Sequence, residues 1–584
     1  MRKKFRYMGY IFRDCHNAFP AFYAINFIMY AISITVGVLG PLLLAHILEL
    51  AAGIEGSSRS SLAGAIMLYG VCIGVPPVIG VVLRSCYQVA EVRGKKYFGN
   101  QLFAFSRKIR LEALENPDVL DRFYSADKGG TAQFQFMDRL ILVTQSIILC
   151  IGTVIVVGRY SPILIFTGLI ELFPDIFTKL YFEKRLADFR RIQIIASRRC
   201  SYFLKLLTRK ESIKELRVMG AEQYMKEKWV GENTRKLQGL REVNLDICRK
   251  QVYGIIVINA CYAFNIGLAF YLMIRGEISI GAFAACLSAF TMLHSNLGSV
   301  VANFAEVVKQ YYVVEEYYDY FTIPTEENGT EIYQPFQDKI LAEDVHFSYS
   351  GSDGEALSGL SLEIGRGEHV VIVGENGSGK TTFSKILTGA YLPSQGSVAY
   401  DGHRTEELNR KSLYDRISMV QQDFVHYHFT LRENIGIGNL KHMDDTGAMK
   451  ALLCRVAGEE FLDKTGGLDV QLGREFGGQE LSGGEWQKVA IARGLWKDSD
   501  IIILDEPASA LDPLAEYDIL SKLVEMIRGK TSVIISHRVG ICRTADRIIV
   551  MKGGRMVESG RHEELLQAGG EYAHIWKEQA KWYQ

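Results

Sequence analysis

The sequence has no excess of charge of either sign, because 66 basic residues balance 66 acidic ones over 584 positions. This balance argues against nucleic acid as the obligatory partner, since nucleic-acid-binding domains normally carry a basic surface. Hydrophobic residues make up 48% of the chain, which argues against intrinsic disorder. No repeat or low-complexity tract stands out either. We therefore expect an ordered protein, and the length predicts two or more domains.

The ten cysteines form no C-x-x-C pair and no cluster of the kind that staples a small secreted domain. They are scattered from Cys15 to Cys542, so neither a disulfide framework nor a cysteine metal site has the spacing that it needs. A reduced cytosol or a lipid environment fits this cysteine usage best.

Long apolar runs fill the first half of the chain, and each is about the length that an α-helix needs to cross a bilayer. They predict six membrane spans, at residues 20–50, 62–87, 138–158, 162–182, 252–274 and 280–306. The first run is far longer than the apolar core of a signal peptide, so we expect it to be retained, with residues 1–15 as an interfacial helix. The alternative for 138–182 is a buried helical hairpin of a soluble domain.

Lysine and arginine are unevenly placed between the predicted spans. The connections 51–61, 158–162 and 275–280 are short and carry one arginine each, whereas 84–110 and 179–250 are long and rich in both residues. Basic connections stay on the cytoplasmic side of a membrane. The pattern therefore predicts a multi-pass protein in the lipid bilayer, with both termini in the cytoplasm.

Apolar density falls after the last run, and proline and glycine appear in IPTEENGTEIYQP. We place a linker there, which predicts a membrane domain at 1–324, a linker at 325–337 and a second domain at 338–584. In the second domain, β-rich runs such as HVVIVGE and DIIILDEP alternate with helical segments. This alternation is typical of an α/β domain whose mainly parallel sheet is covered on both faces.

The segment GENGSGKT, residues 374–381, follows the strand HVVIVG and matches the phosphate-binding pattern G-x-x-x-x-G-K-[ST] in full. Its glycines let the backbone wrap around phosphate groups, Lys380 is placed to reach the outer phosphates, and Thr381 offers its hydroxyl to Mg²⁺. The alternative is a glycine-rich turn without function, but a strand before the segment and a helix after it are the context that phosphate binding requires.

Two further predicted strands end in candidate catalytic groups. After the apolar run IIIL, Asp505 is placed to hold Mg²⁺ or its water, and Glu506 can polarise a water that attacks the γ-phosphate. His537 follows the strand TSVIIS and would lie at the same sheet edge, which makes it a candidate γ-phosphate contact. The alternatives are a solvated pair of acids and a structural histidine.

A second anion site is predicted in LSGGEWQKVAIARG, residues 481–494, where Ser482 begins a helix. The free N–H groups and the dipole at such a helix start favour a negative charge. Because a complete phosphate loop already lies upstream, this second site raises the question of whose phosphate it binds.

The segments GENGSGKT, LSGGEWQKVAIARG, IIILDEP, SALD and ISHR, in this order, resemble the nucleotide-binding domain of ABC transporters. The six predicted spans resemble the fused membrane domain of the exporter-type half-transporters. The resemblance implies an α-helical polytopic membrane domain followed by an α/β P-loop ATPase domain. It also implies ATP hydrolysis with Mg²⁺, coupled to export across the bacterial cytoplasmic membrane.

The resemblance assigns roles to individual residues. Glu506 is expected to be the catalytic base, His537 the γ-phosphate switch and Lys380 a catalytic cation. The expected Mg²⁺ residues are Thr381, Gln422 and Asp505, although the neighbouring Gln421 leaves a shift of one residue open. The expected nucleotide-binding residues are Tyr349, as the adenine-stacking aromatic, and Gly374, Glu375, Asn376, Gly377, Ser378, Gly379, Lys380, Thr381, Thr382, Gln422, Ser482, Gly483 and Gly484.

In this family the signature LSGG caps the ATP that the other subunit's phosphate loop holds, which implies a dimer with composite ATP sites. SALD, residues 509–512, matches the loop that crosses this interface. The nucleotide motifs are intact, so a homodimer and a heterodimer with a related subunit both stay open. One departure is Glu485, where the family most often has glutamine; its charge is unfavourable near polyphosphate unless a basic group pairs with it.

Polar residues inside the predicted spans are candidates for the cargo pathway. They are Glu171, Asp175, Asn259, Asn265, His294 and Asn296. If the two acids face the pathway, a cationic or amphipathic cargo is favoured, and the alternative is a hydrogen bond between helices. The amphipathic stretches 114–126 and 211–225 resemble the family's coupling helices.

Within the exporters, LGREFGGQELSGGEWQKVAIARG, with Trp486 after the signature, most resembles bacterial exporters of modified peptides such as lanthionine-containing bacteriocins. A cationic peptide is therefore the expected cargo. A lipid or drug flippase and a metallophore importer on the same scaffold stay open. A regulatory or mechanical ABC ATPase that does not transport is the alternative of another class, but the six spans argue against its soluble members.

Overall fold

The computed structural model describes residues 6–52, 59–170, 172–326, 328–349, 352, 354–508 and 513–580. The chain forms two compact units. Unit 1 comprises Met1–Arg107 and Asp121–Ile323, and unit 2 comprises Lys108–Leu120 and Pro324–Gln584. The short segment Lys108–Leu120 thus belongs to the unit that the second half of the chain forms.

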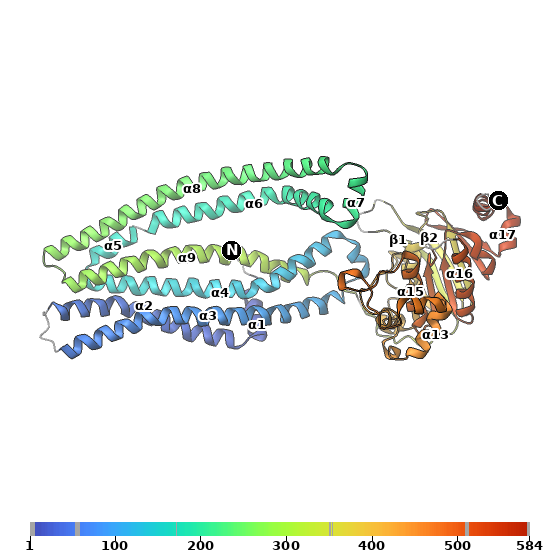
Figure 1. Ribbon diagram of the computed structural model, residues 1–584, viewed down its shortest axis with the longest axis horizontal. Helices are drawn as coiled ribbons and strands as arrows, with labels where there is room; N and C mark the ends of the chain where they lie inside the picture. The colour runs from blue at the N-terminus through green and yellow to red at the C-terminus, as the bar shows by residue number, and fades with distance from the viewer. Residues whose placement is uncertain are drawn as a thin grey trace. The chain divides into compact units, whose positions relative to one another are not determined.

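Unit 1 is built from long helices, several of which lie side by side, such as α6 with α8 and α2 with α3 (Figure 1). Nearly all backbone groups of such helices are satisfied within the helix, as a lipid environment demands. The helices are α1 (Met8–Ala18), α2 (Ala21–Ala51), α3 (Arg59–Ser106), α4 (Pro117–Tyr160), α5 (Pro162–Ile170), α6 (Leu172–Thr208), α7 (Lys210–Val218), α8 (Glu222–Ile274) and α9 (Ile280–Tyr320).

Five helices of the described chain are long and apolar enough to cross a membrane. They are Ala21–Ala51, Ser60–Ser106, Asp118–Tyr160, Glu222–Ile274 and Ile280–Tyr320, and they contain five of the predicted spans. The remaining predicted span, 162–182, falls on α5 and the start of α6, and Glu171 between them lies outside the described residues. Helix α3 runs on through Pro76 and Pro77.

Helix α1 is tied to the end of α9 by tyrosines. The hydroxyl of Tyr318 donates to Asp14 Oδ2 over 3.0 Å, and the hydroxyl of Tyr7 donates to Asp319 Oδ1 over 3.0 Å. The rings of Tyr7 and Tyr318 stack with their centroids 4.8 Å apart. The helix predicted at residues 1–15 thus corresponds to α1 at Met8–Ala18, which is anchored to the last helix of unit 1, and residues 1–5 lie outside the described residues.

Unit 2 contains two sheets rather than the one that the sequence predicts. A four-stranded antiparallel sheet has the order β2-β1-β4-β5, and a six-stranded sheet has the order β10-β9-β3-β8-β7-β6. Their strands are β1 (Lys339–Phe347), β2 (Leu357–Gly365), β4 (Gln395–Tyr400), β5 (His403–Arg404), β3 (His369–Gly374), β6 (Ile417–Val420), β7 (Ile501–Asp505), β8 (Thr531–Ile535), β9 (Arg547–Lys552) and β10 (Arg555–Gly560).

The centre of the six-stranded sheet is parallel, because β3 pairs in parallel with β8 and β9, and β7 with β6 and β8. All residues of β7 and β8 are buried, as expected for strands covered on both faces. Parallel strands bring their carboxyl ends to one edge. Gly374 of β3, Asp505 of β7 and Ile535 of β8 therefore end at the same edge.

The helices of unit 2 pack around these sheets. Clusters of buried apolar residues, drawn from strands and helices, form the core of its described part. The α-helices are α10 (Lys380–Leu387), α11 (Arg410–Arg416), α12 (Leu431–Gly436), α13 (Thr446–Ala457), α14 (Glu459–Thr465), α15 (Gly483–Trp496), α16 (Pro513–Met526), α17 (His562–Ala568) and α18 (Glu571–Ala580). Short 3-10 helices include η1 (Leu111–Glu115), η2 (Leu440–His442), η3 (Arg474–Phe476) and η4 (Val539–Thr544).

Candidate functional site

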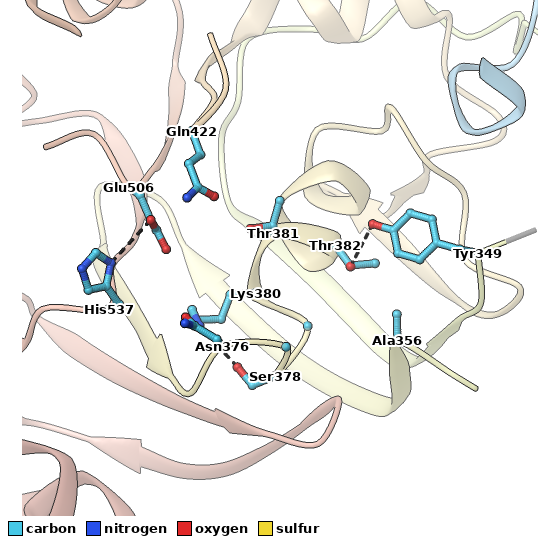
Figure 2. A pocket seen from close by; sticks show the side chains of 12 residues that line it. Tyr349, Ala356, Asn376, Ser378, Lys380, Thr381, Thr382, Gln422, Glu506 and His537 are labelled. Atoms are coloured by element: carbon cyan, nitrogen blue, oxygen red, sulfur yellow. Dashed lines mark hydrogen bonds and ion pairs between the residues drawn. The ribbon is translucent and has the colours of Figure 1, made fainter. Parts of the chain in front are cut away.

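The carboxyl edge of the six-stranded sheet carries a cavity of about 580 Å³, shown in Figure 2. Its lining residues are Tyr349, Ala356, Asn376, Gly377, Ser378, Gly379, Lys380, Thr381, Thr382, Gln422, Glu506 and His537. The sequence predicted all of these as site residues except Ala356, which lies just before β2 and carries no recognisable signal. Residues from distant parts of the chain therefore meet where the strand ends place them.

The phosphate loop depends on glycine at two positions. Gly379 is the N-cap of α10 with φ of 96°, and a Cβ there would lie 2.6 Å from the carbonyl oxygen of Ala356. At Gly374, with φ of 155°, a Cβ would lie 2.2 Å from the carbonyl oxygen of Met551. Larger side chains are excluded at both. The first N–H groups of α10 have no carbonyl partner in the helix, so this end of the cavity is suited to phosphate.

Lys380 is buried at the base of the cavity (Figure 2). Its ammonium group donates to the carbonyl oxygens of Gly374 and Glu375, over 2.8 Å each. Burial lowers the pKa of Lys380, although the nearby carboxylates of Glu506 and Asp505 oppose this shift. The carbonyl groups of the loop thus hold the ammonium group of Lys380 in place. From there the lysine side chain can rotate toward a phosphate oxygen.

Asp505 is buried, and its Oδ1 atom has no hydrogen-bond partner among the described residues. Its Oδ2 atom lies 3.5 Å from the hydroxyl of Ser384. Burial raises the pKa of Asp505 despite a hydrogen bond from Thr381. A buried polar atom without a partner often marks the place of an ion or a water. Because Thr381 and Gln422 line the adjacent cavity, these oxygens form a donor set suited to a hard cation. Gln421 is not among the lining residues, so the geometry favours Gln422.

Glu506 and His537 point toward one another, with Glu506 Oε2 and His537 Nδ1 3.4 Å apart (Figure 2). Glu506 has φ of 49°, a left-handed conformation that is rare for a residue with a side chain and often marks a functional site. Its carbonyl oxygen accepts from Gln487 Nε2 over 3.3 Å. Gln487 lies on α15, so the helix that follows the signature also supports the backbone of Glu506.

Tyr349 lies at the other end of the cavity (Figure 2). Its hydroxyl hydrogen-bonds with Thr382 Oγ1 over 3.0 Å, and its ring packs edge-on against Phe347 with centroids 5.1 Å apart. The aromatic face is thereby held beside the phosphate loop, where a flat base attached to the phosphates can stack on it.

Ser482 is the N-cap of α15, as predicted. Its N–H donates to Glu485 Oε2 over 2.8 Å, and its hydroxyl bonds with the same oxygen over 2.8 Å. Glu485 also receives a hydrogen bond from Lys464 over 2.5 Å. Burial opposes the shift, but the bonds from Lys464 and Ser482 hold the pKa of Glu485 below its usual value. The basic group that the sequence left open is therefore Lys464.

Several predicted residues do not line this cavity. Ser482, Gly483 and Gly484 are not among the described residues that line the cavity, although they belong to the same chain as its phosphate loop. Gly374 and Glu375 belong to the phosphate loop but contribute backbone carbonyls beneath the lysine. SALD, residues 509–512, lies outside the described residues.

Unit 1 has a second, polar cavity of about 730 Å³, lined by residues of α2, α3, α4 and α9. Its charged residues are Arg84, Asp138, Arg139 and Glu306. Arg139 donates to Asn303 Oδ1 over 3.1 Å. The sequence analysis did not single out these four residues, because each lies at the end of a predicted span, where charged residues are common. The signal that could have found them is that charges occur at the ends of several spans.

The predicted pathway residues lie elsewhere. Glu171 and the side chain of Asp175 lie outside the described residues. Asn259 donates to the carbonyl oxygen of Ile255 over 2.8 Å. Asn265 is buried and lines an apolar cavity of about 410 Å³ between α5 and α8. On α9, His294 lies near the ring of Tyr262, with centroids 6.4 Å apart, and Asn296 is partly buried.

Comparison with known protein families decides what this pair of units is. Residues 357–509, which include the phosphate loop and the signature, match the family model for the ABC transporter domain. This chain belongs to the ABC transporters. The match implies that unit 2 binds ATP.

Curated relatives resemble the transporter over much of its length. The subtilin transport ATP-binding protein SpaT of Bacillus subtilis is 29% identical over 480 residues, 79% of this chain and 76% of the relative. The nisin transport ATP-binding protein NisT of Lactococcus lactis subsp. lactis is 28% identical over 547 residues, 90% of this chain and 89% of the relative. An ATP-dependent lipid A-core flippase of Alkalilimnicola ehrlichii is 32% identical over 363 residues, 62% and 61% of the two chains.

Among solved structures, a bacterial Atm1-family ABC exporter with ATP bound matches with a TM-score of 0.80 at 22% identity, covering 95% of this chain and 98% of that one. This likeness confirms the predicted fold class. The transporter is a half-transporter of the exporter type, a multi-pass membrane protein with one membrane domain and one ATPase domain. It hydrolyses ATP and couples the hydrolysis to export.

Proposed function

We propose that the transporter works as a dimer, with itself or with a related subunit, in which each ATP site is assembled from two chains. The signature supports this proposal. Ser482 caps α15, which Gly483 and Gly484 begin, and the N–H groups of a first helical turn have no carbonyl partner in the helix and suit a phosphate. Yet these three residues do not line the cavity that their own chain's phosphate loop forms. Their phosphate then belongs to the other chain.

Within each site, the residues of one cavity divide the work. Lys380 and the start of α10 bind the phosphates of ATP, and Tyr349 stacks on the adenine. Thr381, Gln422 and Asp505 would hold Mg²⁺, which neutralises phosphate charge when bound. The orphan Oδ1 atom of Asp505 fits this role.

Glu506 accepts a proton from the water that attacks the γ-phosphate. His537, 3.4 Å from Glu506, contacts the γ-phosphate and keeps the glutamate oriented. The distance suits this division, because one imidazole can contact the carboxylate and leave its other ring nitrogen for the phosphate. Gln487 also donates to the carbonyl oxygen of Glu506 and so holds its backbone.

The test is Glu506→Gln in the full-length transporter in lipid nanodiscs. ATP hydrolysis should fall by at least about a hundredfold, because general-base catalysis typically contributes that much. ATP binding should persist and trap a stable dimer, seen as a shift in mass when ATP is added. Glu343→Gln, an exposed acid on β1, is the matched control and should leave both measurements unchanged. Unchanged hydrolysis in Glu506→Gln, or an ATP-loaded protein that stays monomeric, contradicts the proposal.

We also propose a peptide cargo, cationic and post-translationally modified. The relatives described as transporting subtilin and nisin support it, as does the polar cavity in unit 1 with Asp138 and Glu306. Charges of both signs in this cavity suit a peptide, which carries amide groups and charged side chains. The flippase relative favours a lipid cargo instead, so the two cargoes need a direct comparison.

The proposed location is the bacterial cytoplasmic membrane, with both termini and the ATPase unit in the cytoplasm. The basic residues of 84–110 and 179–250 support this orientation. Glu171, Asp175, Asn259, Asn265, His294 and Asn296 stay proposed pathway residues.

A further inference from the structure

Glu485 occupies the third position of α15 and closes a capping box with Ser482. One carboxylate oxygen, Oε2, takes both the N–H and the hydroxyl of Ser482, over 2.8 Å each. The carboxylate therefore fixes the start of the signature helix. It also places a full negative charge within one helical turn of the groups that must receive a polyphosphate, and like charges at such distances repel.

Lys464 supplies the opposite charge from another helix. It lies in the last turn of α14, and its Nζ atom is 2.5 Å from Glu485 Oε1. The Glu485 side chain is 15% exposed and that of Lys464 is 65% exposed, so the pair lies at the surface with its carboxylate mostly covered. Two oxygens of one carboxylate are thus divided between the signature serine and the lysine.

The position of Lys464 is set by packing. Phe461 of α14 and Trp486 of α15 belong to one buried apolar cluster, against which Leu462 also packs. The carbonyl oxygen of Lys464 accepts from Gln479 Nε2 over 3.5 Å, in the segment that leads to the signature. Helix α14 therefore cannot move away from the start of α15 without breaking this cluster.

We infer that Lys464 is a positioning residue for ATP binding: it neutralises Glu485, so that the signature can receive the polyphosphate held by the other chain. This inference rests on the proposed composite site. In a signature with glutamine at this position, the lysine has no charge to neutralise. In this chain, Lys464 and Glu485 therefore act as a coupled pair: Lys464 affects ATP binding only while Glu485 is present.

The experiment measures the ATP concentration that half-saturates dimer formation in the Glu506→Gln background, in full-length protein in nanodiscs. The KM and kcat for ATP are measured in parallel with the catalytic glutamate intact. The variants are Lys464→Met, Lys464→Arg, Glu485→Gln and the double variant Lys464→Met with Glu485→Gln. Lys339→Met is the matched control, because Lys339 pairs with Glu363 over 3.3 Å on the antiparallel sheet.

Lys464→Met should raise the half-saturating ATP concentration and the KM on the order of fivefold, since the pair is partly screened by water, with a smaller change in kcat. Lys464→Arg should restore the wild-type value. Glu485→Gln should need no more ATP than the wild type, and the double variant should match Glu485→Gln. Lys339→Met should have no effect.

Two results overturn the inference. One is Lys464→Met without any change in ATP dependence. The other is an equal loss with and without Glu485→Gln, because the lysine would then contact phosphate directly or only maintain the fold. If instead no dimer forms with ATP even in Glu506→Gln alone, the composite site itself fails, and that outcome is distinct from both.

Discussion

Asp505 shows at the scale of one residue how a binding site lowers the stability of the protein that carries it. Its carboxylate is buried with one oxygen lacking a partner in the described chain, and burial raises its pKa. An acid whose pKa is raised on folding binds its proton more tightly in the folded state. Its charge therefore destabilises the fold above the folded-state pKa, and this penalty disappears as the pH falls through that pKa.

Asp505→Asn should consequently separate activity from stability. ATP hydrolysis should fall by at least about a hundredfold, because the proposed cation loses a ligand. The thermal midpoint of the nucleotide-free ATPase unit, measured with a chelator present, should rise by about 2–4 °C, as expected for roughly 1 kcal/mol in a unit of this size. The rise should shrink as the pH is lowered.

The control is Asp546→Asn, an exposed acid that accepts the backbone N–H of His369 over 2.9 Å at the opposite edge of the sheet. It should not stabilise the protein. A lower midpoint for Asp505→Asn would mean that the buried carboxylate stabilises the apo fold.

At the scale of one element, the 3-10 helix η1 shows how a short segment can belong to a unit that later residues of the chain mainly form. Residues 114–126 were expected to form one coupling helix, but η1 ends at Glu115 and α4 begins at Pro117. The carboxylate of Glu115 accepts from Lys385 Nζ over 2.9 Å and also from the hydroxyl of Tyr391. Bonds from Tyr391 and Lys385 lower the pKa of Glu115. Lys385 lies on α10, the helix that begins at the phosphate loop.

Glu115→Gln should therefore weaken the link between the nucleotide site and the segment that joins α3 to α4. We expect cargo-stimulated ATP hydrolysis to fall several-fold while the basal rate stays within about twofold, because a charge-assisted hydrogen bond is replaced by a neutral one. The measurement is the ratio of stimulated to basal rate in nanodiscs. Glu112→Gln is the control in the same element, since Glu112 pairs with Arg110 over 3.7 Å. An equal loss in both variants would contradict a specific role for Glu115.

The second expected coupling stretch, 211–225, forms α7, a turn and the start of α8. Val218 and Met219 at this turn are strongly exposed, at 90% and 69%. Their apolar surface is unusual for a turn between two charged helices.

At the scale of the whole molecule, the identity of the cargo decides which transport the ATPase drives. A cationic lanthipeptide precursor should stimulate ATP hydrolysis by the full-length transporter more than a lipid or drug panel does. Asp138→Asn and Glu306→Gln should each reduce this stimulation several-fold, because they remove negative charge from the polar cavity. The measurement is a titration of stimulated ATPase activity.

Glu277→Gln, between α8 and α9, is the control and should respond like the wild type. A larger response to lipid than to peptide would favour the flippase alternative. Unaltered peptide stimulation in both cavity variants would place the cargo elsewhere in unit 1.

The amino-acid sequence alone determined the features that depend on neighbouring residues. Each of three features consists of residues that are neighbours in the chain: the phosphate loop, the Asp505–Glu506 pair and the N-cap at Ser482. Their backbone geometry follows from local composition. Apolar runs predicted the spans for the same reason, since bilayer thickness sets helix length. Apolar runs in the second half of the chain predicted a mainly parallel sheet, because buried runs such as β7 and β8 are typical of parallel strands, but they predicted neither the strand order nor the second, antiparallel sheet.

Only the tertiary structure decided which distant residues meet. Lys464 reaches Glu485 and Glu115 reaches α10, yet no pattern in the sequence joins these positions. Asp138 and Glu306 share a cavity, for which their places at the ends of predicted spans were the only signal. The tertiary structure also favoured Gln422 over Gln421 at the nucleotide cavity. The physical reason is that periodicity and turn chemistry act over a few residues, whereas these contacts arise from the packing of whole helices and sheets against one another.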